Sequence, residues 1–174
     1  TRFRTDPRLP PALKDKVIKH IDEDRSGSLW VSTTDGLYEY SPTSTKIRAY
    51  RHDSTDTRTL TTNQIKKVYE DTKGVVWVLT DKGLNQLDRR TGRIIQYKAT
   101  ENTSYSISQN RINDVIEDPA GNLWIAIEFG GLNKISRRSR EFRTFAYPQS
   151  NPSILESHQH SIWVVRGDSL MRLG

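Results

Sequence analysis

Three aspartates recur at one fixed interval and are the first candidates for chemistry. Asp24, Asp71 and Asp118 are separated by 71 − 24 = 47 and 118 − 71 = 47 residues. Carboxylates brought together could act as a general acid and base, or could bind calcium. Each aspartate, however, begins its own Asp-x-x-Gly stretch, and a type I turn takes Asp as an acceptor at its first position and Gly at its fourth. We therefore interpret the three carboxylates as turn acceptors.

The aromatic and imidazole groups offer two further sites. Aromatic faces can stack on sugar rings, but each tryptophan lies in a short apolar run, which favours core packing (Trp30, Trp77, Trp124, Trp163). His158-x-His160 places two imidazoles on one predicted strand face, a half-site for zinc, with no third ligand in register. The sequence has no cysteine, phosphate-binding loop or nucleophile motif. We expect no catalysis, no metal site and no cofactor.

The elements that surround each turn are short strands. Ile65-x-x-Val68 precedes the second turn and Val76-Trp77-Val78 follows it, Gly83 marks another tight turn, and Ile94-x-x-Tyr97 marks a fourth strand. Four short antiparallel strands in a repeat of about 47 residues are typical of one blade of a β-propeller. The sequence predicts an all-β fold in which blades stack and cover each other's faces.

The repeat predicts one propeller domain or segment over residues 1–174. Complete repeats run over about 13–50, 60–97 and 107–145, and a partial blade covers 155–174, with residues 1–5 on a fourth strand that could complete it. From Leu60 to Trp77 is 17 residues, whereas from Leu155 to Trp163 is 8. We therefore expect the last blade to lack nine residues of first strand and hairpin. A cut through a longer array would leave the same pattern.

The net charge is +6, and basic residues gather at two equivalent turns between third and fourth strands: Arg89, Arg90, Arg93 and Arg137, Arg138, Arg140. We interpret them as a solvated outer rim; the alternative is a docking surface for an anionic glycan, a lipid headgroup or a partner. No aromatic residues are interleaved with them, so a nucleic-acid partner is not expected. No apolar run is long enough to span a bilayer, which predicts no direct membrane insertion.

The full pattern resembles a known family. The string Ile-x-x-Val-x-Glu-Asp-x-x-Gly-x-x-Trp-Val-x-Thr-x-x-Gly-Leu at 65–84, and its approximate copies at 18–37 and 112–132, resemble the two-component regulator propeller repeat. Ile127 departs from that pattern, because the other copies have Thr33 and Thr80. The resemblance implies a periplasmic or extracellular sensor region of a bacterial hybrid histidine kinase or diguanylate cyclase, commonly tuned to glycan fragments. Its signalling output would lie outside this chain.

One end of the predicted propeller carries the variable side chains. The loops between second and third strands and the connectors between blades emerge at the same end, and loops on a rigid scaffold are where binding usually resides. We predict a site for a small polar ligand or oligosaccharide there, formed by Asp35, Asn63, Asp81, Lys82, Asn110, Glu128 and Phe129. The competing interpretation is that these are ordinary polar loops whose asparagines cap the connectors.

Three function classes follow from this organisation. The first is a non-catalytic sensor segment that binds a ligand, and the second is a polysaccharide lyase or hydrolase built on a propeller. The third is a protein-interaction scaffold. As other partners we expect neighbouring blades or a second copy of the chain, since an incomplete fourth blade would leave sheet faces to cover.

Overall fold

The computed structural model describes residues 11–41, 43–44, 46–100, 106–136, 138, 141–145, 152–157, 161–166 and 168–173. Several sequence predictions lie outside these residues: the completing strand at 1–5, the zinc half-site at His158 and His160, and the rim residues Arg137 and Arg140. A short 3-10 helix, Pro11–Leu13, precedes the first strand.

The described residues form fifteen strands in four antiparallel sheets, which confirms the all-β prediction. Blade 1 comprises β1 (Ile18–Glu23), β2 (Leu29–Thr33), β3 (Gly36–Tyr40) and β4 (Ile47–Tyr50). Blade 2 comprises β5 (Ile65–Glu70), β6 (Val76–Thr80), β7 (Leu84–Leu87) and β8 (Ile94–Tyr97). Blade 3 comprises β9 (Ile112–Glu117), β10 (Leu123–Ile127), β11 (Gly131–Ile135) and β12 (Phe142–Phe145). Blade 4 has β13 (Ser153–Glu156), β14 (Ile162–Arg166) and β15 (Ser169–Leu173).

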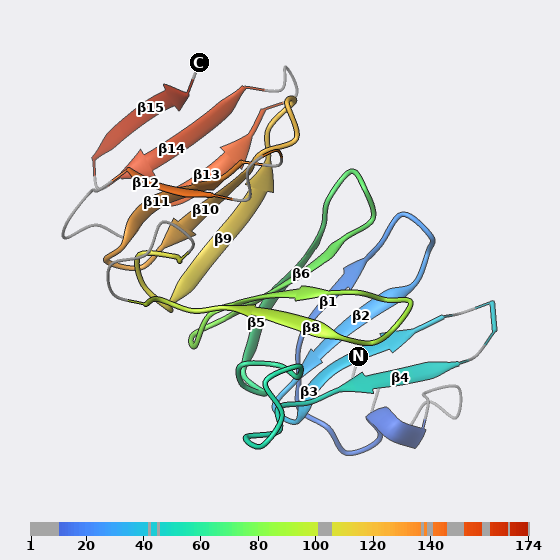
Figure 1. Ribbon diagram of the computed structural model, residues 1–174. Coiled ribbons are helices and arrows are strands. Elements are labelled where there is room, and N and C mark those ends of the chain that lie inside the picture. Colours follow the sequence, from blue (N-terminus) through green and yellow to red (C-terminus); the bar gives the residue numbers. More distant parts are fainter. Residues whose placement is uncertain are drawn as a thin grey trace.

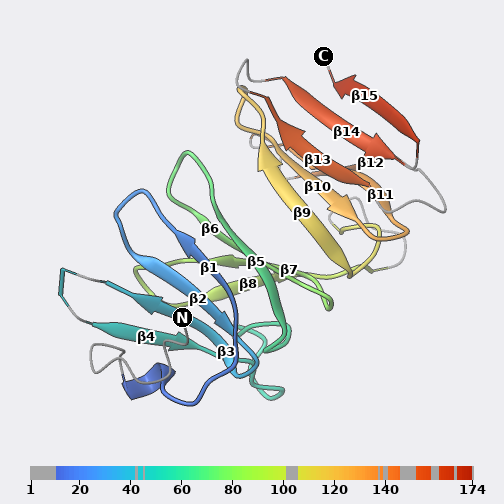
Figure 2. The same cartoon turned by 180° about the vertical axis from the view of Figure 1, so that it is seen from behind.

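The blades follow one another in an open arc. In each sheet the strands pair in chain order, and the first strands of successive blades, β1, β5, β9 and β13, contact one another along the inner side. Figure 1 and the reverse view in Figure 2 place blade 1 (blue) and blade 4 (red) at opposite ends. One end of every blade therefore carries the β1–β2-type hairpins, and the other carries the β2–β3-type loops and the connectors.

Apolar side chains fill the spaces between neighbouring blades. Trp30 and Leu37 of blade 1 pack with Val68 and Val78 of blade 2, and the same arrangement recurs between blades 2 and 3. Blade 3 packs on blade 4 through a third cluster around Trp124. The predicted core role of the tryptophans is confirmed for Trp30, Trp77 and Trp124, which are buried, whereas Trp163 on the last blade is half-buried.

The fourth blade corrects the sequence prediction. Leu155 pairs with Trp163 just as Tyr69 pairs with Trp77, so Leu155 belongs to the first strand and is not equivalent to Leu60. The two residues that flank the hairpin turn also pair, because Ser157 N donates to Ser161 O as Asp71 N donates to Val75 O. The nine absent residues are missing from the connector: Tyr97 to Ile116 is 19 residues, whereas Phe145 to Leu155 is 10. A shorter connector reaches the same strand.

Both ends of the arc expose apolar side chains. Val17 just before β1 and Ile21 within it are about half exposed, and Leu155 and Leu170 on the outward face of blade 4 are 65% and 61% exposed. These faces correspond to the ones that are buried between blades 1 and 2. Among the described residues there is no helix long and apolar enough to cross a membrane.

Candidate functional site

The predicted ligand face lies at the end of the blades where β2–β3, β6–β7 and β10–β11 are joined. In blades 1 and 2 a threonine shapes this loop, because Thr33 Oγ1 donates to Gly36 O at 3.0 Å and Thr80 Oγ1 donates to Gly83 O at 2.7 Å. Each hydroxyl also accepts the second loop residue's backbone N–H, from Asp35 and Lys82. The two loops are therefore tight and similar.

The third loop differs because its first residue cannot make these bonds. Ile127 occupies the position of Thr80, and one additional residue is accommodated before Gly131. Gly130 N donates to Ile127 O at 3.1 Å, and Phe129 adopts a left-handed backbone with φ of 56°. Left-handed conformations are uncommon outside Gly, Asn and Asp. The departure from the repeat seen in the sequence thus produces a distinct loop.

Phe129 is the most conspicuous side chain on this face. It is 59% exposed, although burial of an aromatic ring would be favourable. The preceding residue, Glu128, is ion-paired with Arg111 (3.2 Å) and lies 4.0 Å from Lys66 of blade 2. Glu128 therefore lies between two cations at the junction of blades 2 and 3, beside the exposed ring. The sequence did not predict Lys66 and Arg111 as site residues. The available signal was their position at the start of an inner strand, since Lys66 is the second residue of β5 and Arg111 directly precedes β9.

Asp35 in the first loop is engaged within its own blade. Its Oδ2 pairs with Lys16 Nζ at 2.7 Å and with Arg51 Nη2 at 3.1 Å, and it accepts the Tyr38 hydroxyl at 2.9 Å. The hydrogen bond from Lys16, followed by those from Tyr38 and Arg51, holds the pKa of Asp35 well below its usual range. The Arg51 guanidinium also lies 5.4 Å from the centre of the Tyr38 ring. Asp35 is thus an anion with its charge already compensated.

The two asparagines have equivalent positions and equivalent bonds. Asn63 Oδ1 accepts His52 N, and Asn110 Oδ1 accepts Ala99 N, each at 2.7 Å. Both amides therefore cap the connectors, as the competing interpretation expected; their participation in ligand binding stays a prediction.

The second loop presents one charge and one unusual oxygen. Lys82 is exposed, and Asp81 is half-buried. Asp81 Oδ1 is fully buried and has no hydrogen-bond partner among the described residues. Buried polar atoms are nearly always paired, so this oxygen is an exception. Of the seven predicted residues, Asp81 and Lys82 adjoin each other in the second loop and Glu128 and Phe129 in the third, and no described contact joins Asp35 or Asp81 to the third loop.

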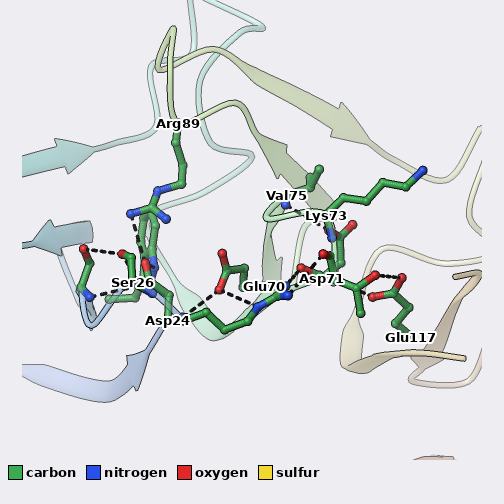
Figure 3. A network of polar contacts seen from close by, with 12 residues as sticks. Asp24, Ser26, Glu70, Asp71, Lys73, Val75, Arg89 and Glu117 are labelled. Atoms are coloured by element: carbon green, nitrogen blue, oxygen red, sulfur yellow. Dashed lines mark hydrogen bonds and ion pairs between the residues drawn. The ribbon is translucent and has the colours of Figure 1, made fainter. Parts of the chain in front are cut away.

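A second polar network occupies the opposite, hairpin end (Figure 3). Asp71 Oδ1 accepts Lys73 N and Val75 N at 2.9 and 3.0 Å, and its Oδ2 accepts the Trp77 indole N–H at 3.1 Å. Asp24 and Asp118 bind their own turn and tryptophan in the same way (Ser28 N, Trp30, Asn122 N, Trp124). The predicted turn-acceptor role is confirmed, and the carboxylates also anchor the core tryptophans. Their positions in separate blades form no acid–base or metal cluster.

The glutamate that ends each inner strand ties the blades together. Glu70 Oε2 accepts Arg25 N at 3.0 Å, and Arg25 also donates its Nη2 to Asp71 O. Glu117 accepts Thr72 N at 2.6 Å and Thr72 Oγ1 at 2.7 Å. A carboxylate of one blade thus caps the hairpin of the blade before it (Figure 3).

The interpretation of the basic residues as a solvated rim is wrong for Arg89. Its guanidinium binds Glu39 at 2.6 Å and Asp24 at 3.1 Å, both in blade 1, and lies 5.3 Å from the centre of the Trp30 ring. Burial alone would lower the pKa of Arg89, but its bond with Glu39 and the nearby carboxylates raise it. Lys134 makes the related contact in blade 3, 4.6 Å from the Trp124 ring centre and 3.5 Å from Asp118.

Comparison with known proteins agrees with this geometry. Residues 106–128 match the family described as two component regulator propeller, and no curated protein sequence matches the chain. The extracellular domain of the hybrid two component system BT3049 from B. thetaiotaomicron is 21% identical, with a TM-score of 0.75 over 90% of this chain and 22% of that one. The extracellular domain of BT4673 from the same organism is 26% identical, with a TM-score of 0.69 over 90% and 23%.

An enzyme shares the fold as well. Virginiamycin B lyase from Staphylococcus aureus, solved with quinupristin, is 17% identical, with a TM-score of 0.67 over 91% of this chain and 53% of the lyase. At that identity the likeness concerns the fold alone. The chain spans less than a quarter of the two B. thetaiotaomicron domains. These neighbours and the repeated blades show that the chain is a β-propeller segment, of which residues 106–128 match the two-component regulator propeller family.

Proposed function

We propose that this chain is the ligand-binding part of an extracellular or periplasmic sensor, and that it recognises a small polar, polyhydroxylated ligand such as a glycan fragment without catalysing its conversion. The two-component resemblance and the two extracellular structural neighbours support the sensor assignment. The ligand class rests on the loop end of blades 2 and 3.

The observation that carries the proposal is the Phe129 ring. An L-residue in the left-handed region costs about 1–2 kcal/mol, and strained backbone of this kind persists where the surrounding structure or a function requires it. Here the strained residue is exposed rather than packed. An exposed aromatic ring can stack on a sugar ring, and the carboxylate of the adjoining Glu128 can accept hydrogen bonds from the sugar hydroxyls.

The test begins with a glycan array probed with the chain, followed by calorimetric titration of the tightest neutral oligosaccharide. Phe129→Asn should weaken its binding about tenfold, since loss of one aromatic contact is worth about 1–2 kcal/mol. Asn tolerates the left-handed backbone, so the fold is retained. The control is Ile95→Asn, which removes an exposed apolar side chain from the outer strand β8 and should leave binding unchanged.

The outcomes separate the function classes. Equal binding by wild type and Phe129→Asn would place the site elsewhere on the molecule. Appearance of new reducing ends or unsaturated uronic-acid products during incubation with the bound oligosaccharide would support the lyase or hydrolase alternative and would refute the non-catalytic proposal. Absence of any glycan ligand, together with capture of a defined protein partner by the loop end, would favour the scaffold.

A further inference from the structure

A groove lies between the rims of blades 1 and 2, at the hairpin end and therefore opposite the proposed glycan face. Its volume is about 350 Å³, and four cationic side chains line it: Lys46, Arg48, Arg89 and Arg90. Serine hydroxyls, including those of Ser28 and Ser41, and the Glu39 carboxylate complete the lining. Ligand pockets usually measure about 300–1,000 Å³, so the groove fits a compact small molecule.

The floor of the groove is already saturated by internal contacts. Glu39 Oε1 accepts Arg89 Nε at 3.1 Å and Nη2 at 2.6 Å, and Glu39 Oε2 accepts the Tyr50 hydroxyl at 2.9 Å. Burial, followed by the bond to Glu39, raises the pKa of Tyr50 to about 12. Arg89 is further held by Asp24 at 3.1 Å. Each carboxylate oxygen of Glu39 and Asp24 therefore already has a hydrogen-bond donor.

The walls carry three of the four cations of the groove. Arg48 Nη1 donates to Arg89 O at 2.9 Å, which fixes the guanidinium across the junction of the two blades. Ser41 N donates to Lys46 O at 3.0 Å and closes the turn beside the groove. Lys46, Arg48 and Arg90 are exposed, and none of them forms an ion pair within the described part of the chain. Asp88 in the same turn also faces this charge, because its pKa is lowered by its bond from Thr91 and by the nearby Arg90. Four cations against Glu39, Asp24 and Asp88 leave 4 − 3 = +1 at this junction.

The next junction repeats only part of this arrangement. The groove between blades 2 and 3 measures about 140 Å³, and its described lining is largely apolar. Arg93, Arg137 and Arg138 correspond in sequence to Lys46, Arg89 and Arg90, so the basic turn recurs. Gln86 stands at the position of Glu39 and Ile95 at that of Arg48, so the buried carboxylate and the bridging guanidinium belong to the first junction.

We propose that the groove between blades 1 and 2 binds a compact oxyanion: a phosphate, sulfate or carboxylate group, free or carried on a sugar-sized molecule. Guanidinium groups form paired, charge-assisted hydrogen bonds with such groups, and Arg48 and Arg90 have donors to offer. The Lys46 ammonium adds a point charge, and the serine hydroxyls donate to or accept from the carrier. This site is independent of the glycan proposal, because the two lie at opposite ends of the blades.

The experiment is a calorimetric titration of the chain, at low ionic strength, with sodium sulfate, glucose 6-phosphate, glucuronate and neutral glucose. At least one oxyanion should bind and glucose should not, and addition of about 0.15 M NaCl should weaken binding because exposed charges are screened. The double variant Lys46→Gln/Arg90→Gln should lower the affinity about tenfold or more, since charge-assisted bonds contribute strongly.

The matched control is the double variant Lys46→Gln/Arg93→Gln. Arg93 belongs to the same β7–β8 turn as Arg90 and is equally exposed, but it lies near Asp56 and does not line the groove. This control changes the net charge by the same amount and should lose less affinity than the test variant. Stronger binding of sulfate than of glucose 6-phosphate would assign the free ion, and the reverse order would assign an anionic carrier. The proposal would be overturned if the two double variants lost affinity equally, or if glucose bound as well as the anions. Binding of acidic vesicles without binding of any small anion would also overturn it.

Discussion

The Asp71 carboxylate should be the most sensitive single position in the fold. It is 2% exposed and accepts two backbone N–H groups and the Trp77 indole N–H, so it joins a hairpin turn to the core packing of blade 2. Asp71→Ala removes the two oxygens that accept these three hydrogen bonds and leaves the three donors in place. We expect a large loss of stability with no change at the proposed ligand loops, which lie at the other end of the blade.

The magnitude follows from how many donors can regain water. Lys73 is exposed, so its N–H can be rehydrated, whereas Val75 N is partly buried and Trp77 Nε1 is buried. Two unpaired donors at about 1–3 kcal/mol each give a destabilisation of about 3 kcal/mol. For a domain of this size, about 2–4 °C of melting temperature corresponds to 1 kcal/mol, so the melting point should fall by about 6–12 °C.

The assay is thermal unfolding followed by circular dichroism, with Asp88→Ala as the control. Asp88 is also a turn acceptor, for Arg90 N and Thr91 Oγ1, but it is exposed and has no buried donor. Its removal should change the melting point far less. If the two variants melted alike, the buried donors would not be the cause. The double variant Trp77→Phe/Asp71→Ala should lose less stability than the sum of the losses of the two single variants, because both remove the same indole hydrogen bond. Additive losses would show that this bond does not couple the two residues, and would refute the reasoning.

Three further predictions concern the ties between blades, pH and backbone strain. Glu117→Ala leaves Thr72 N without its 2.6 Å acceptor in the next blade and should lower stability by about 1–3 kcal/mol in a urea titration; a loss below about 0.5 kcal/mol would contradict the tether. Burial raises the pKa of Asp24 and Asp118, but the hydrogen bonds that they accept outweigh burial and hold both pKa values below 3.8. The stability that these carboxylates add is therefore complete above pH 3.8, and it is lost as the pH falls through their pKa values in the folded state. Melting points should therefore decline below about pH 4, and an Asp24→Asn variant should decline less steeply. Phe129→Asn should melt at or above the wild-type temperature because its left-handed backbone is less strained; a clear decrease would show that the ring is structural.

The sequence predicted those parts of the fold that depend on neighbouring residues. Strand runs, the Asp-x-x-Gly turns and the buried tryptophans all follow from local patterns repeated three times, and all three copies agree with the structure. The fourth blade was misaligned because Leu155 was matched to a connector leucine. The available signal was Glu156, which precedes Trp163 by seven residues just as Glu70 precedes Trp77, and which ends the first strand in both blades.

Contacts between blades were not predictable in the same way. Arg89 was assigned to solvent because its partners, Asp24 and Glu39, are 65 and 50 residues earlier in the chain. Their meeting depends on how blade 2 is rotated against blade 1, which no local pattern encodes. The ion pairs of Glu128 with Lys66 and Arg111 were missed for the same reason. A side chain with several rotatable bonds can reach either solvent or the next blade, and only packing decides between them.

The three copies separate structural positions from candidate binding positions within one chain. Where all copies agree, as at Asp71 and Trp77, the side chains are buried and bonded within the blade or to its neighbour. Where they disagree, as at Glu39, Gln86 and Lys134, or at Thr80 and Ile127, the local charge or loop shape changes without disturbing the strands. The first set of differences accompanies the oxyanion groove, and the second produces the Phe129 loop. Substitutions at such positions should therefore change binding more than folding, because the repeat itself shows that the blade accepts different residues there.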